Sequence, residues 1–187
     1  MRKNFGPQTL LYPMPVLIIG SFDENGNPNA MNAAWGGIYD TNQVIICLGS
    51  HRTTDNIKKS KAFTVAFATV ETVTASDYVG LVSQSNEPDK IKKAGLHYEK
   101  ASKVNAPLFL NYPLTIECEL VDLINEGEGG GNIIGQIVNV SADEKILTNG
   151  KVDYKKLKPI TFDASNHQYV ALGEVVAEAF KEGLKLK

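Results

Sequence analysis

Short runs of apolar and β-branched residues, separated by clusters of turn formers, recur along this chain and predict strands. Two of the clusters, residues 23–28 and 40–42, predict turns between neighbouring strands. The expected strands cover residues 16–22, 29–37, 43–48, 62–69, 114–125, 133–140 and 168–172. Such a series of short strands favours a β-barrel, because a doubly wound sheet requires strands that alternate regularly with crossover helices.

Helical spacing is confined to a few insertions between these strands. Residues 71–82 carry apolar side chains at helical intervals, and residues 89–94 end at Gly95, a helix stop signal. Thr53 or Thr54 is expected to N-cap a helix over residues 55–60. With a helical turn at 154–157 and a closing helix at 174–182, the chain is predicted to be mainly β with α insertions.

Composition is that of an ordinary globular protein. The chain has 187 residues, 43% of them hydrophobic and 21% charged, which favours a single domain over residues 1–187. Its net charge is -2, and no block of like charges offsets it. We therefore expect no nucleic-acid partner and no membrane-surface role.

The cysteines and histidines bear on location and on metal binding. Cys47 and Cys118 lie in apolar runs, so both are expected to be buried, reduced thiols. Pro13 and Pro15 interrupt the apolar stretch at residues 10–20, so we expect no signal peptide and a cytoplasmic location. The three histidines lack the spacing of metal ligands, and no metal site is expected.

Residues 29–37 form an unusually slim segment around the single tryptophan. Trp35 is flanked by Ala33, Ala34 and two glycines, and glycine in a strand often marks the close approach of a ligand or another backbone. Asn29 and Asn32 are poor strand formers whose amides suit the polar edge of a ring. The alternative is a tryptophan that belongs to the core, and the segment alone does not decide between the two.

A phosphate-suited segment follows about a dozen residues later. Ser50, His51, Arg52 and Thr53 combine hydroxyls and a guanidinium with the start of a helix, and helix-start N–H groups bind anions. The alternative is a capped helix with solvated basic side chains. A flat ring bound at the first segment and a phosphate at the second together describe flavin mononucleotide (FMN).

Asp89 and Lys90 form a third candidate element. Lys90 has the reach to contact a phosphate or the negative charge of a reduced flavin, whereas the plainer alternative is a solvated first helical turn. The glycine-rich residues 127–132 lack dinucleotide-loop spacing and are expected to be a mobile turn. No serine lies in a nucleophile elbow and no Cys/His pairing suggests nucleophilic catalysis, so no catalytic residue is assigned.

The chain resembles the flavin reductase-like family, in its flavoredoxin-type branch, over roughly residues 10–175. The matching motifs include Pro13-Met14-Pro15-Val16, Gly20-Ser21-Phe22-Asp23, Ala33-Ala34-Trp35-Gly36-Gly37, Ser50-His51-Arg52-Thr53, Asp77-Tyr78-Val79-Gly80, Asp89-Lys90 and Tyr169-Val170-Ala171-Leu172-Gly173. The resemblance implies an FMN-binding split β-barrel that forms a homodimer, with flavin sites near the subunit interface.

The same resemblance assigns roles to individual positions. The isoalloxazine ring would contact Asn29, Asn32, Ala33, Ala34 and Trp35. The ribityl phosphate would contact Ser50, His51, Arg52, Thr53 and Asn56. Ser83, Asp89 and Lys90 would close the site, with Tyr169 nearby. Where many relatives have a histidine, shortly before Ile133, this chain has Asn132 after two glycines, so that contact is missing or is supplied by Asn132.

Two functions remain open at this point. One is an FMN-dependent oxidoreductase that takes electrons from NADH or NADPH and passes them to an acceptor. The other is an FMN-containing electron carrier that exchanges electrons with a partner protein and has no nicotinamide site. An oligonucleotide-binding barrel is disfavoured by the net charge and by the single Trp. The sequence identifies neither the acceptor nor the preferred nicotinamide, and does not say whether FMN is fixed or exchanged.

Overall fold

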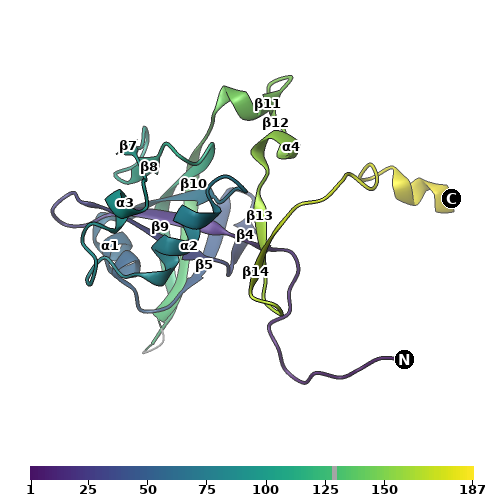
Figure 1. The fold of residues 1–187 in the computed structure, drawn as a ribbon, viewed down its shortest axis with the longest axis horizontal. Coiled ribbons are helices and arrows are strands. Elements are labelled where there is room, and N and C mark those ends of the chain that lie inside the picture. Colours follow the sequence, from purple (N-terminus) through teal and green to yellow (C-terminus); the bar gives the residue numbers. More distant parts are fainter. Residues whose placement is uncertain (128–129) are drawn as a thin grey trace.

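The computed structural model describes residues 1–127 and 130–187, and its centre is a seven-stranded antiparallel sheet (Figure 1). The strands run in the order β3-β2-β6-β9-β10-β5-β4. Their bounds are β2 (Leu17–Phe22), β3 (Pro28–Ala33), β4 (Gly36–Asp40), β5 (Gln43–Leu48), β6 (Ala62–Phe67), β9 (Leu114–Gly127) and β10 (Gly130–Ala142). The mainly β prediction is confirmed.

Chain connectivity closes this sheet into a barrel. Strands β3 and β4 are its two opposite edges, yet only Ala34 and Trp35 separate them in the chain. Edges joined by two residues must lie close together, so the sheet has to curl. Register shifts between β9 and β10 contribute, because bulges bend strands and increase their twist. The barrel therefore has one seam, between β3 and β4, which the 34–35 link crosses.

Two apolar cores lie on the two faces of the curled sheet. The inner core fills the barrel and includes Leu17, Ile46 and Phe63. Gly135 is needed there, since a Cβ at this position would overlap the Phe63 ring. The outer core includes Ile18 and lies under the elements that cover the barrel, which are α2 (Val73–Leu81), α3 (Lys90–Lys93), β1 (Met14–Pro15), β13 (Ile160–Asp163) and β14 (Gln168–Ala171).

The remaining elements are short. They are α1 (Arg52–Ser60), β7 (Tyr98–Lys100), β8 (Pro107–Phe109), β11 (Leu147–Thr148), β12 (Lys151–Val152), α4 (Tyr154–Leu157) and the 3-10 helices η1 (Glu144–Ile146) and η2 (Glu182–Leu186). Both chain ends project from the barrel on the side of β13 and β14 (Figure 1). In the described part of the chain, no helix is long and apolar enough to cross a membrane.

Several sequence predictions are wrong. The strand expected over 29–37 is two strands, because the chain turns at the seam. The closing helix over 174–182 does not form; residues 172–178 have no regular structure, and η2 begins only at Glu182. A nine-residue helix without a packing partner is not stable in water, which accounts for its absence. Strands β7, β8 and β13 were not predicted.

Two smaller expectations also bear on the site. Cys118 is buried as expected, but Cys47 is exposed, because β5 lies beside the edge strand β4 and has one open face. Both thiols are free. The mobile turn expected over residues 127–132 has its centre, residues 128 and 129, outside the described residues.

Candidate functional site

Buried amides link the β2–β3 hairpin to α1. Asn29 is 2% exposed, and its Nδ2 donates to Thr53 Oγ1 at 2.8 Å. Asn56 Nδ2 donates to Ser21 Oγ at 3.2 Å. Asn29 Oδ1 is buried and accepts no hydrogen bond from any described residue. A buried amide oxygen without a donor is costly, so this atom is suited to a ligand that brings one.

Helix α1 begins three residues earlier than expected, at Arg52, and its cap differs from the prediction. The N-cap residue is His51, which makes no side-chain capping bond. Thr53 receives the Asn29 amide, and Thr54 Oγ1 donates back to the Gly49 carbonyl at 3.0 Å. Capping by Thr53 or Thr54 is therefore wrong, and the N–H groups of the first turn have no side-chain acceptor from the N-cap position.

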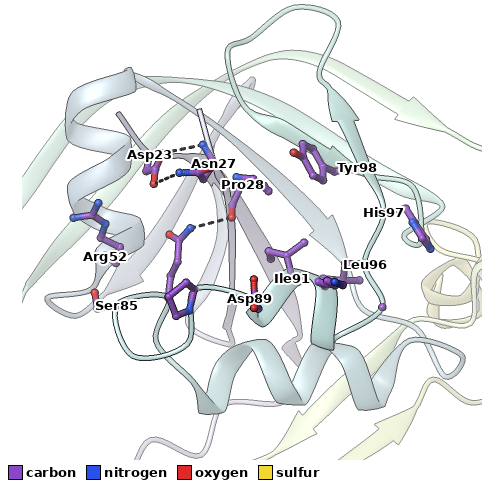
Figure 2. Close-up of a pocket in the computed structure, with 14 residues that line it drawn as sticks. Asp23, Asn27, Pro28, Arg52, Ser85, Asp89, Ile91, Leu96, His97 and Tyr98 are labelled. Carbon is purple, nitrogen blue, oxygen red and sulfur yellow. Dashed lines mark hydrogen bonds between the residues drawn. The ribbon is translucent and has the colours of Figure 1, made fainter. Parts of the chain in front are cut away.

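Arg52 lines a cavity of about 730 Å³ between the β2–β3 turn and the segment that carries α3 (Figure 2). Within the described residues its guanidinium makes no hydrogen bond or ion pair. Its positive charge still acts on the cavity: burial would raise the pKa of Asp23, but hydrogen bonds from Asn27 and Asn25, and then Arg52, lower it. An unpaired guanidinium beside a cavity of this size suits an anionic ligand group.

Lys90 points away from that cavity. It is 2% exposed, and its Nζ donates to the carbonyls of Val79 at 2.9 Å and Val82 at 2.6 Å, at the end of α2. Burial lowers the pKa of Lys90 to about 8. The amine therefore caps the carboxyl end of α2 in this structure, whereas the neighbouring Asp89 lines the cavity.

The opposite face of β3 carries a second polar group. Asn32 Nδ2 donates to the Ser76 carbonyl at 3.0 Å and to the Tyr169 hydroxyl at 3.4 Å. Tyr169 in turn donates to Asp77 Oδ1 at 2.7 Å. Burial, followed by the contact with Asp77, raises the pKa of Tyr169 to about 12, so the hydroxyl stays protonated at neutral pH. These residues border a cavity of about 270 Å³ that also includes Ala34.

The seam end of β3 is apolar. Trp35 is 55% exposed and borders a cavity of about 650 Å³ formed with the N-terminal arm, residues 8–15. The Cys47 amide donates to the Trp35 carbonyl at 2.8 Å, and Asn132 lies directly opposite Cys47 in the β5–β10 pair. Asn132 therefore lies one strand away from Trp35, on the strand next to the one whose Cys47 amide bonds the Trp35 carbonyl.

Comparison with known proteins decides the family. A family model described as a flavin reductase-like domain matches residues 9–163. The chain belongs to the flavin reductase-like family. Among solved structures, the flavoredoxin of Desulfovibrio vulgaris (Miyazaki F) is 34% identical, with a TM-score of 0.92 over 98% of this chain and 100% of that one. The flavoredoxin of Methanosarcina acetivorans is 26% identical, with a TM-score of 0.88 over 100% of both chains.

These similarities identify the fold of this flavin reductase-like chain as the FMN-binding split barrel of flavoredoxins. A curated relative, an uncharacterised protein of Aeropyrum pernix, is 25% identical over 124 residues, which is 65% of this chain and 47% of that protein. The chain thus spans about half the length of that relative.

The flavin reductase-like chain distributes its predicted site residues over three places along β3. Asn29, Thr53, Asn56, Arg52 and Asp89 lie at or near the hairpin end. Asn32 and Tyr169 lie on the outer face, and Ala34 and Trp35 lie at the seam. Ser50, His51 and Ser83 are exposed, Ala33 packs in the inner core, and Lys90 faces α2. Sequence reasoning included Asp77 only within a motif and assigned it no role.

The chemistry of these residues fits FMN. Arg52 and the first turn of α1 suit a phosphate, and the unpartnered Asn29 oxygen suits a hydroxyl or ring N–H donor. Small residues at the seam leave room beside Trp35 for a flat ring. Among the residues described, no group of three or more His, Cys, Asp or Glu is arranged to hold a metal ion.

Proposed function

We propose that this protein binds FMN and acts as an NAD(P)H-dependent oxidoreductase of the flavin reductase or flavoredoxin type. The single observation that carries the proposal is the buried Asn29 oxygen, which has no donor among the described residues, on a side chain bonded to Thr53, the neighbour of Arg52 in the chain. Asn29 and Arg52 both lie on the segments that the family resemblance assigns to the flavin. The proposal therefore combines family membership with two unsatisfied groups of this chain.

In this proposal the residues along β3 divide the work of binding. Arg52 and the start of α1 hold the phosphate, Asn29 accepts a hydrogen bond from the flavin, and Ala34 and Trp35 shape the place of the ring. When bound, FMN would supply the redox chemistry, which is to take a hydride from a reduced nicotinamide and to pass its two electrons to an acceptor. Tyr169, held protonated by burial and by Asp77, orients the Asn32 amide.

An anaerobic titration tests this proposal. The purified protein is mixed with FMN, and binding is measured by calorimetry. The complex is then titrated with NADH and with NADPH while flavin absorbance is followed. We expect binding, and bleaching by at least one nicotinamide. Protein that shows no binding of FMN would refute the whole proposal, and the nicotinamide that bleaches the flavin faster identifies the preferred donor.

A second function, an FMN-containing electron carrier, is favoured by Asn132. This residue occupies the region where many relatives have a histidine, and it lies opposite Cys47, next to the seam. If that contact serves the nicotinamide, its loss leaves FMN bound but unreactive toward NADH and NADPH. Rapid bleaching of the bound flavin by either nicotinamide rules the carrier out. Slow bleaching, together with fast reduction by a protein donor, supports it.

We also propose that the protein forms a homodimer through the side that carries the chain ends. Apolar side chains there are strongly exposed, including Ile38 at 73%, Leu11 at 74% and Phe180 at 100%. Several large apolar side chains exposed on one side of a protein are suited to contact with a second copy of the chain. Analytical ultracentrifugation is expected to show a dimer, and Ile38→Asp is expected to raise the monomer fraction. A monomeric wild-type protein at micromolar concentration contradicts the proposal.

The free thiols of Cys47 and Cys118 support the reducing cytoplasm as the proposed location.

A further inference from the structure

The cavity beside Arg52 extends well beyond the residues assigned to FMN. Of the residues that line its 730 Å³, only Arg52 and Asp89 belong to the expected flavin contacts. Figure 2 shows Arg52 on one side and Tyr98 and His97 on the other. The cavity is therefore large enough for a second ligand group that begins near Arg52 and extends toward Tyr98.

The far side of this cavity offers an aromatic ring held in place. Tyr98 packs edge-on against Phe22, with ring centroids 6.2 Å apart, and against Phe109 at 6.4 Å. It is nevertheless 44% exposed, so part of its ring remains open. A rigid aromatic ring with an open face is a stacking surface for a nucleobase, and such stacking tolerates any base.

Charged groups without partners lie on the same cavity. Across residues 1–127 and 130–187, three charged groups make no hydrogen bond and no ion pair. They are the Asp89 carboxylate, the Lys92 amine and the Arg52 guanidinium. Asp89 lies between Arg52 and Tyr98 in Figure 2. A carboxylate is the group that binds the paired hydroxyls of a ribose in dinucleotide sites, and a guanidinium binds phosphate.

We propose that the cavity lined by Arg52, Asp89, Ile91, Leu96, His97 and Tyr98 is a subsite for an adenosine 5′-phosphate group. The base stacks on Tyr98 beside His97, the ribose hydroxyls donate to Asp89, and the phosphate lies toward Lys92, next to the FMN phosphate that Arg52 holds. Ile91 and Leu96 supply an apolar floor for the base. This group occurs in NADH, NADPH and FAD, so the inference deepens the proposed function and rests on it for the ligand's source.

Direct binding of ADP tests the subsite. ADP is titrated by calorimetry into the protein freed of flavin and into the protein saturated with FMN. Tyr98→Leu removes the ring but keeps an apolar side chain against Phe22 and Phe109, and Tyr98→Phe is the matched control that keeps the ring. We expect Tyr98→Leu to weaken ADP binding about tenfold or more, and Tyr98→Phe to leave it within twofold.

The two sources of the group give different results. If it comes from the electron donor, ADP binds the FMN-saturated protein and competes with NADH or NADPH. If the adenylate group comes from FAD, ADP binds only the flavin-free protein. FAD then binds more tightly than FMN in the wild type, and the two bind equally in Tyr98→Leu. Either result supports the subsite.

Two outcomes overturn the inference. ADP that fails to bind either form at millimolar concentration shows that the cavity takes no adenylate. Equal weakening of FMN and ADP by Tyr98→Leu shows that the cavity holds the flavin ring itself. Because ADP is also titrated into the flavin-free protein, a failure of the proposed FMN binding is seen separately in the FMN titration and is not mistaken for a failure of the subsite.

Discussion

The two ends of β3 offer a ligand opposite surroundings. At the hairpin end, Asn29, Thr53 and Arg52 present amide, hydroxyl and guanidinium groups, and one buried oxygen has no donor. At the seam end, Ala34 and Trp35 border a mainly apolar cavity without a charged side chain. The strand thus separates a place for an anion from a place for an apolar ring.

This contrast shows how one short strand is suited to a ligand with an anionic tail and a flat head. Successive side chains of a strand alternate between faces, so Asn29 and Asn32 lie on opposite sides of β3. Accordingly, Asn29 contacts α1 while Asn32 contacts α2 and Tyr169. A ligand that uses both asparagines has to pass around the edge of β3, which is free because β3 is an edge strand.

The largest expected effect on stability comes from placing a negative charge at the hairpin end of β3. Asn29→Asp places a carboxylate at a fully buried position and should destabilise the fold by about 3 kcal/mol or more at pH 8. Burial raises the pKa of the introduced carboxyl above its unfolded value, so the loss grows as pH rises above about 4 and shrinks in acid. Urea unfolding at several pH values measures this.

The matched control is Asn25→Asp in the exposed β2–β3 turn, which should change stability by no more than about 0.5 kcal/mol. An equal loss in both variants, or a loss that does not depend on pH, would contradict the burial of the Asn29 side chain at this end.

Arg52→Ala is expected to weaken FMN binding by about 1.5–3 kcal/mol, because a charge-assisted contact to the phosphate is lost. Calorimetry should show a change of roughly ten- to 150-fold in Kd. The fold should stay intact, since Arg52 has no partner among the described side chains. Lys59→Ala, at an exposed position in the last turn of the same helix, is the control. Unchanged affinity in Arg52→Ala means that the anion is bound elsewhere.

Tyr169→Phe removes the hydroxyl that bonds Asn32 and Asp77 on the outer face of β3 and should destabilise the fold by about 1 kcal/mol. Burial and Asp77 raise the pKa of Tyr169 to about 12, so its contribution is complete below pH 10 and is lost as pH rises toward 12. Burial also raises the pKa of Tyr112 to about 12, so absorbance titration at alkaline pH should show one late-titrating tyrosine fewer in the variant than in the wild type. The same number of late-titrating tyrosines in both proteins would contradict this.

The smallest effect on stability is expected at the seam. Trp35→Leu should change the free energy of unfolding by no more than about 0.5 kcal/mol, since the side chain is more than half exposed. FMN affinity should fall several-fold with an unchanged dependence on salt. In Arg52→Ala, by contrast, added salt should weaken binding less than in the wild type, because the screened charge is gone. If the wild type, Trp35→Leu and Arg52→Ala all show the same salt dependence of FMN binding, the hairpin end does not bind the anionic group.

The barrel could be predicted because its strands alternate with strong turn signals. Residues 23–28 carry a glycine and a proline at a turn, and the structure confirms the hairpin. The break at Ala34 and Trp35 could not be seen, because both residues are compatible with a continuous strand. It depends on β3 and β4 lying at opposite edges of the sheet, which is a property of the whole topology.

For the candidate site, the sequence indicated which residue types to expect but not where each side chain would point. Arg52 and Asp89, which the family resemblance assigned to one ligand site, line the same cavity. Lys90 turns to the carbonyls that end α2, because a buried amine binds the nearest free acceptors. Tyr98 and His97 were missed, since a short strand with one aromatic residue gives no signal until the fold brings it opposite Arg52.

The two-residue crossing of the seam sets a mechanical limit. Three peptide units link Ala33 to Gly36, so these two Cα atoms can never be more than about 11 Å apart. Whatever movement the rest of the chain makes, the end of β3 and the start of β4 stay close together. Any widening that admits a bulky molecule must therefore occur at the opposite end of the seam.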